Sequence, residues 1–352
     1  MFKKVFQSAA FCASAACSVV ASAADFNVGL RNLNVPHHGS SIETSVWYPT
    51  AASESVQNFG PYAPKVAVDA PVAEAKGGAS AQGKFPIVLV SHGTGGSAMG
   101  HYLQAEALAR AGFVVVSLTH PGDNFQDRSL VPDKRYLFER PRQVSAVLDA
   151  LLASTDWKDR IDAGRVGAYG HSAGGYAVAA LIGGIPDLTR LAVHCQSVKD
   201  DPSCDLRDPS QFVVPSNKVP LKLPDSVLAA GDVSDKRVRA AVMVAPWGAP
   251  VQSGSLKNTM ASVKLIGAEF DQILPAKYHF EYLRSELPQG SDRVTTRIAA
   301  GAGHLSFVVP VRPEWKARMG VVAMDPPGFD RAALHQTLSP EVVAFFEKAL
   351  KP

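Results

Sequence analysis

The sequence contains 352 residues, of which 46% are hydrophobic and 19% charged. These values are ordinary for a globular protein and allow one large domain or two small ones. The formal net charge is only +3. This near balance excludes the strongly basic composition of proteins that bind nucleic acid through their surface charge, and we expect no nucleic-acid partner.

The first 24 residues carry a targeting pattern. Lys3 and Lys4 precede the apolar run Ala9–Val20, which ends in Ala21-Ser22-Ala23-Ala24. This order predicts a secretory signal peptide, residues 1–24, and the run is too short and too rich in alanine to predict a membrane span. We therefore expect residues 25–352 to form a single exported domain, periplasmic or extracellular.

Short apolar runs alternate with helical patterns in the first half of the chain. Phe85–Ser91 is continuously apolar, as expected of a parallel strand buried on both faces. Residues 51–83 lack periodicity and predict a surface excursion, and Pro141 is expected to open a helix in its first turn. Strands are predicted at 26–33, 42–48, 85–91, 113–118 and 166–169. Helices are predicted at 98–110, from 141 onward and at 176–182.

The alternation of strand and helix patterns stops between residues 185 and 235, where prolines are frequent. We expect this insertion to be a lid over the active site, although a decoration far from the site fits the same pattern. It holds Cys195 and Cys204, the only cysteines after residue 24. An even pair in an oxidising compartment predicts a disulfide, with two free thiols as the alternative. A metal site is not expected, because His194 alone does not complete a zinc shell.

The remaining pattern completes an α/β class. Strands are predicted at 238–245, 263–267 and 293–298, and an amphipathic helix at 339–350. The alternation predicts a mostly parallel central sheet flanked by helices on both faces. Trp247 follows one strand end and is expected either to form an apolar wall for the substrate or to belong to the core.

The stretch Gly170-His171-Ser172-Ala173-Gly174 fits the pattern G-x-S-x-G between a predicted strand and a predicted helix. That context is typical of a nucleophile elbow, a sharp turn that exposes the serine oxygen. Ser172 is therefore the candidate nucleophile. A Gly-rich turn made only for packing fits the motif as well. The choice between the two interpretations depends on whether the chain also offers a base and an acid for Ser172.

A serine nucleophile needs a base, and the base needs an orienting acid. His304 follows the predicted strand 293–298 in a glycine-rich loop and is the candidate base. Asp271 follows the strand 263–267 and is favoured as the acid over Glu269. The second backbone donor of an oxyanion hole, beside Ala173, is expected at Thr94 in the loop 92–96, with Gly93 or Gly95 as alternatives.

These motifs together with Arg140-Pro141 and the cysteine pair resemble exported bacterial α/β-hydrolases of the dienelactone-hydrolase-like kind. They are also similar to platelet-activating factor acetylhydrolases. The resemblance covers roughly residues 47–309 and implies a serine carboxylic-ester hydrolase without a cofactor, acting on a small-molecule, lipid or polymer ester. Dienelactone hydrolases use a cysteine nucleophile, whereas this chain has Ser172, which favours ordinary esters. A peptidase or amidase with the same triad and a non-catalytic binding protein are the alternatives.

Overall fold

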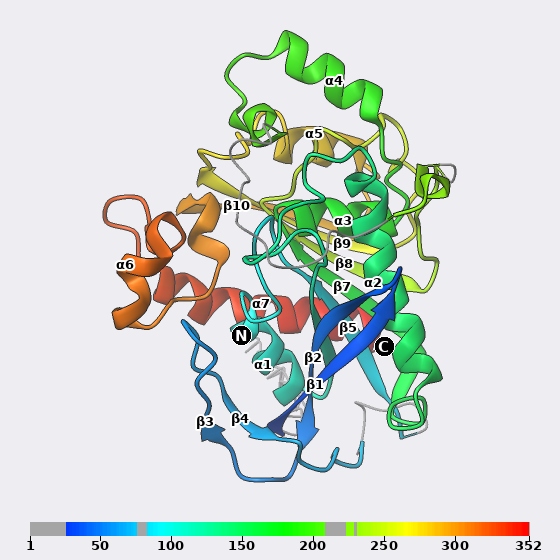
Figure 1. The fold of residues 1–352 in the computed structure, drawn as a ribbon, viewed down its shortest axis with the longest axis vertical. Helices are drawn as coiled ribbons and strands as arrows, with labels where there is room; N and C mark the ends of the chain where they lie inside the picture. The colour runs from blue at the N-terminus through cyan, green and yellow to red at the C-terminus, as the bar shows by residue number, and fades with distance from the viewer. Residues whose placement is uncertain (1–25, 76–82, 208–222, 229–230, 352) are drawn as a thin grey trace, which may run out of the picture.

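The computed structural model describes residues 26–75, 83–207, 223–228 and 231–351 (Figure 1). The predicted signal peptide lies outside these ranges. Parts of the excursion 51–83 and of the insertion 185–235 lie outside them as well. No helix among the described residues is long and apolar enough to cross a bilayer.

The described residues form a mixed sheet in the order β10-β9-β8-β7-β5-β6-β2-β1-β4-β3. The neighbours from β10 to β6 pair in parallel, whereas β1 and β2 form an antiparallel hairpin with β2 beside β6. The predicted, mostly parallel sheet is therefore confirmed. The strands are β1 Asn27–His37, β2 Ser40–Thr50, β3 Ser55–Val56, β4 Lys65–Val68, β5 Phe85–Ser91, β6 Val114–Thr119, β7 Ile161–His171, β8 Val238–Val244, β9 Ser262–Phe270 and β10 Val294–Gly303.

Helices cover both faces of the sheet, as the sequence predicts. α2 (Tyr136–Ala153), α3 (Ala173–Leu181) and α5 (Phe280–Glu286) share one core with one side of the strands. α1 (Tyr102–Arg110) and α7 (Arg331–Leu350) share the other. In β5, Ile87 belongs to the first core and Val88 to the second, because successive strand side chains point to opposite faces.

The prediction that Pro141 opens a helix is wrong. α2 begins at Tyr136, so Pro141 lies inside it and cannot donate the usual bond to the carbonyl of Leu137. The hydroxyl of Tyr176 on α3 donates to that carbonyl over 3.0 Å instead. A tertiary contact, which local sequence does not show, therefore replaces the missing helical bond.

The C-terminal helix is longer than predicted. α7 begins at Arg331 rather than near 339, because the Asp330 side chain accepts a hydrogen bond from the Ala333 N–H and caps the helix. The extension brings His335 into the core beside α1. There its Nδ1 accepts from Gln104 Nε2 over 2.8 Å.

The insertion carries the predicted disulfide between Cys195 and Cys204, which is confirmed. Its described part contains α4 (Leu188–Ser197), which lies beyond α5 in Figure 1. Asp200 holds it to the segment before α5. Asp200 contacts Lys277 and Tyr278, each over 2.6 Å.

Acid should destabilise the fold because the buried histidines take up protons when the protein unfolds. Replacing His335 measures the contribution of one of them. Burial lowers the pKa of His335 from 6.5 to about 4. As the pH falls below 6.5, the unfolded chain takes up a proton that the folded protein refuses until about pH 4. We expect His335→Gln to reduce the loss in unfolding free energy between pH 7 and pH 4 by about 3 kcal/mol.

Urea unfolding of both proteins at several pH values measures this difference. Equal pH slopes for the wild type and His335→Gln would contradict the assignment.

Candidate active site

Ser172 lies in a crowded turn between β7 and α3. Its backbone has φ +58° and ψ −122°, a strained combination for a residue with a side chain. A Cβ on Gly170 would lie 2.1 Å from the Gly174 oxygen, and a Cβ on Gly174 would lie 2.0 Å from the Ser91 oxygen. The two glycines of the motif are therefore sterically required, and the turn has the geometry expected of a nucleophile elbow.

Asp271 and His304 lie beside each other after the neighbouring strands β9 and β10. His304 Nδ1 is 2.8 Å from Asp271 Oδ2, and each side chain is only 3% exposed. The other carboxylate oxygen accepts from the N–H groups of Ile273 and Leu274. The carboxylate is thus fixed from two sides, and it orients the His304 ring with Nδ1 protonated and Nε2 available as a base.

Two expectations around this pair need comment. Glu269, the competing acid, is exposed and accepts from the Gly301 N–H over 2.8 Å, so it holds the backbone and not the His304 ring. The expected loop before His304 is not a loop. β10 continues through a bulge to Gly303, and His304 begins the 3-10 helix His304–Phe307.

His171, inside the motif, has a positioning contact that the sequence did not reveal. Its Nε2–H donates to the backbone oxygen of His304 over 2.9 Å, and the two rings lie 4.9 Å apart. Burial, together with the nearby His304, lowers the pKa of His171 well below its usual value. His171 is therefore neutral at physiological pH and can hold the backbone of His304 without adding charge.

The loop after β5 passes directly over Ser172. A Cβ on Gly93 would lie 3.0 Å from Ser172 Cβ. Gly95 N–H donates to Asp123 Oδ1 over 2.8 Å, and Gly96 N–H donates to the Gly93 oxygen. Both of these donors are occupied, whereas Thr94 N–H has no backbone partner within the described parts of the chain. This favours Thr94 over Gly95 as an oxyanion donor, together with Ala173 at the start of α3.

A buried ion pair holds this loop in place. Asp123 and Arg140 are both fully buried and bonded to each other, and Arg140 also donates to the His92 backbone oxygen. Tyr136 connects the pair to the loop, since its hydroxyl contacts Asp123 over 2.8 Å and the Thr94 hydroxyl over 3.0 Å. From the sequence, Arg140 is identified only within the family resemblance and is not paired with Asp123, because no local pattern connects the two residues.

Neutral histidines complete the surroundings. Burial, reinforced by Arg140, lowers the pKa of His92 to about 4. Burial also lowers the pKa of His101, which lines the cavity, to about 3. The candidate base His304 is therefore surrounded by imidazoles that stay uncharged at neutral pH.

A cavity of about 1010 Å³ opens above Ser172, His304 and the loop 92–96. The excursion contributes to its wall through Phe59–Tyr62, so part of the stretch predicted as a plain surface excursion borders the site. The segment 315–322 after β10 lies beside Phe59–Tyr62 and also lines the cavity, since a Cβ on Gly60 would be 3.9 Å from the Trp315 ring. The large apolar residues that line the cavity include Phe59, Tyr62, Met99, Trp315, Met319 and Val322.

Trp247, a possible wall, and the described part of the expected lid 185–235 do not border the cavity. Trp247 is outside the cavity lining and packs between Tyr136 and Tyr176, with ring centroids 6.4 and 5.9 Å away. It therefore follows the core alternative. No described residue of 185–235 lines the cavity either.

No protein-family model and no curated protein matches this sequence. Among solved structures, the chain is similar to a ferulic acid esterase from Streptomyces cinnamoneus. The match covers 94% of this chain and 92% of that one, with a TM-score of 0.61 and 17% sequence identity. The likeness shows the fold, and the chain has the α/β-hydrolase fold.

Adding one methyl group above Ser172 tests this geometry. In Gly93→Ala the new Cβ contacts Ser172 Cβ at 3.0 Å and His171 Nδ1 at 3.2 Å, so the loop or the elbow must shift. We expect kcat/KM on p-nitrophenyl acetate to fall about 100-fold, because small displacements of catalytic groups are costly.

Gly100→Ala is the matched control, since its Cβ meets no atom closer than 3.5 Å. It should keep activity within about twofold, as expected of a substitution that displaces nothing. Equal activity in the two variants would contradict the inferred contact.

Proposed function

We propose that this protein is a serine hydrolase that cleaves carboxylic esters through Ser172, His304 and Asp271. The observation that supports this best is the Asp271–His304 hydrogen bond of 2.8 Å, at a cavity that Ser172 and His304 both line. The three residues also occur in the chain order serine, acid, histidine that belongs to this fold. The esterase named in the structural comparison supports the same reaction class.

In this mechanism His304 Nε2 takes the proton from Ser172 as the oxygen attacks the ester carbonyl. The Thr94 and Ala173 N–H groups stabilise the oxyanion that forms. His304 then donates its proton to the alcohol, which leaves an acyl group on Ser172. A water molecule, activated by the same histidine, hydrolyses this acyl-enzyme, while Asp271 stabilises the imidazolium in both steps.

The cavity suits an ester with a bulky or aromatic acyl group. Phe59, Tyr62 and Trp315 line the cavity with aromatic rings, and aromatic side chains pack well against flat ligands. The comparison with a ferulic acid esterase points to the same substrate class. We also propose that the protein is exported, on the basis of the signal pattern at residues 1–24 and the Cys195–Cys204 disulfide.

Replacing the nucleophile tests the reaction class. Ser172→Ala should lower kcat on p-nitrophenyl esters by about 10⁴-fold or more, because the attacking oxygen is lost while the fold remains. Ser97→Ala changes another serine of the cavity wall and should leave kcat nearly unchanged. Turnover close to wild type in Ser172→Ala would contradict the assignment.

The substrate class is tested with a series of acyl groups. We expect a higher kcat/KM for methyl ferulate and p-nitrophenyl benzoate than for p-nitrophenyl acetate, since only the larger groups reach the aromatic wall. Trp315→Ala should remove this preference and leave the acetate activity in place. A peptidase or amidase would instead cleave the matching anilides at comparable rates.

A further inference from the structure

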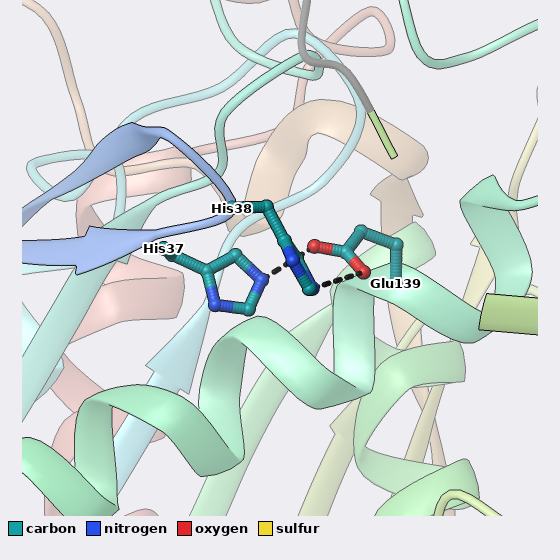
Figure 2. A group of neighbouring side chains, drawn as sticks. All are labelled: His37, His38 and Glu139. Atoms are coloured by element: carbon teal, nitrogen blue, oxygen red, sulfur yellow. Dashed lines mark hydrogen bonds and ion pairs between the residues drawn. The ribbon is translucent and has the colours of Figure 1, made fainter. Parts of the chain in front are cut away.

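A second cluster of reactive side chains lies outside the cavity, at the tip of the β1–β2 hairpin. His37 ends β1, His38 occupies the turn, and both side chains point to Glu139 on α2 (Figure 2). One ligand-type atom from each residue lies within 4.8 Å of the other two. None of the three lines the cavity around Ser172.

Glu139 is a buried carboxylate that is only half satisfied. Its side chain is fully buried, and Oε1 is 2.6 Å from His37 Nε2. Oε2 has no hydrogen-bond partner among the described residues, and His38 Nε2 lies 4.0 Å away from it. An unpartnered buried carboxylate oxygen is costly, so this atom favours a positively charged occupant.

The turn residue gives an independent indication. His38 and Gly39 both have positive φ, +46° and +71°, in a two-residue turn that pairs His37 with Ser40. Turns of this type favour Asn-Gly. Histidine is a weaker choice at that position, and here it places a second imidazole on the same side as His37.

We propose that His37, His38 and Glu139 bind one Zn²⁺ ion. Two imidazoles and one carboxylate are a donor set that zinc accepts, with bonds of about 2.0–2.2 Å and a fourth position for water. Tetrahedral geometry then requires ligand atoms about 3.3 Å apart. His37 Nε2 is 2.6 Å from Oε1 and His38 Nε2 is 4.0 Å from Oε2, so both rings must adjust around the oxygen that binds the ion. The His38 side chain is 34% exposed, which permits this movement.

The surroundings already orient the carboxylate. Gln143, one turn further along α2, donates to Glu139 Oε1 over 3.3 Å, while its own oxygen accepts from His120 Nδ1 over 2.7 Å. Such outer contacts fix the ligands of metal sites. The ion joins the hairpin to α2, so it stabilises the folded protein, and it replaces the proton on His37 Nε2.

A second group of candidate ligands lies at the cysteine pair, where the sequence predicts no metal site. His194, Asp201 and Cys204 also lie close together, but Cys204 is in the disulfide and offers no thiolate. His194 already bonds Asp201 over 2.6 Å. This trio therefore provides a matched control.

The test measures Zn²⁺ binding to the EDTA-treated, dialysed protein by equilibrium dialysis with metal analysis. We expect one bound equivalent for the wild type and for His194→Gln, and none for His38→Asn or Glu139→Gln. Zn²⁺ should raise the Tm of the wild type and leave that of His38→Asn unchanged. Replacement by Co²⁺ should give the visible absorption of a tetrahedral N/O site in the wild type only.

His38→Asn decides the outcome even if Glu139→Gln fails to fold. It creates the favoured Asn-Gly turn, so without metal its Tm should equal or exceed that of the wild type. Loss of the zinc equivalent in this variant then reflects the lost ligand. No bound zinc in the wild type, or a full equivalent retained by His38→Asn, would overturn the proposal.

Discussion

The close approach of β7 and α3 around Ser172 is the constraint on which the site depends. No side chain fits at Gly170 or Gly174, because the Gly174 and Ser91 oxygens occupy those positions. Because of this crowding, Ser172 adopts a strained conformation, and α3 begins at the next residue. The cost is offset by the buried strands on both sides, since the Ser172 N–H is bonded to the Val244 oxygen of β8.

The parallel sheet then gathers residues that are distant in sequence. Asp271 follows β9 and His304 follows β10, so both lie at the edge where β7 delivers Ser172. The loop after β5 reaches the same edge. The Asp123–Arg140 pair holds it there, since Arg140 donates to the His92 backbone oxygen. Burial keeps His92 and His171 neutral, so these two imidazoles add no charge beside the candidate site residues.

Local signals were sufficient for most of the fold and for the candidate site residues. The apolar run Phe85–Ser91 and the glycines around Ser172 have one simple physical interpretation each, and strand ends predict which loops meet. Contacts between distant segments were not accessible in the same way. The Tyr176 hydroxyl replaces the helical hydrogen bond that Pro141 cannot donate. Phe59 and Trp315 are far apart in the sequence but line one cavity. No local pattern carries that information.

The central claim is that Ser172 is the nucleophile of an acyl-enzyme mechanism. The most direct measurement is mass spectrometry of the protein after reaction with a fluorophosphonate, followed by peptide mapping. The account predicts one adduct per chain, on the peptide that contains Ser172, and much slower labelling in His304→Ala. An unmodified Ser172 in the folded protein, or an adduct on another serine, would contradict it.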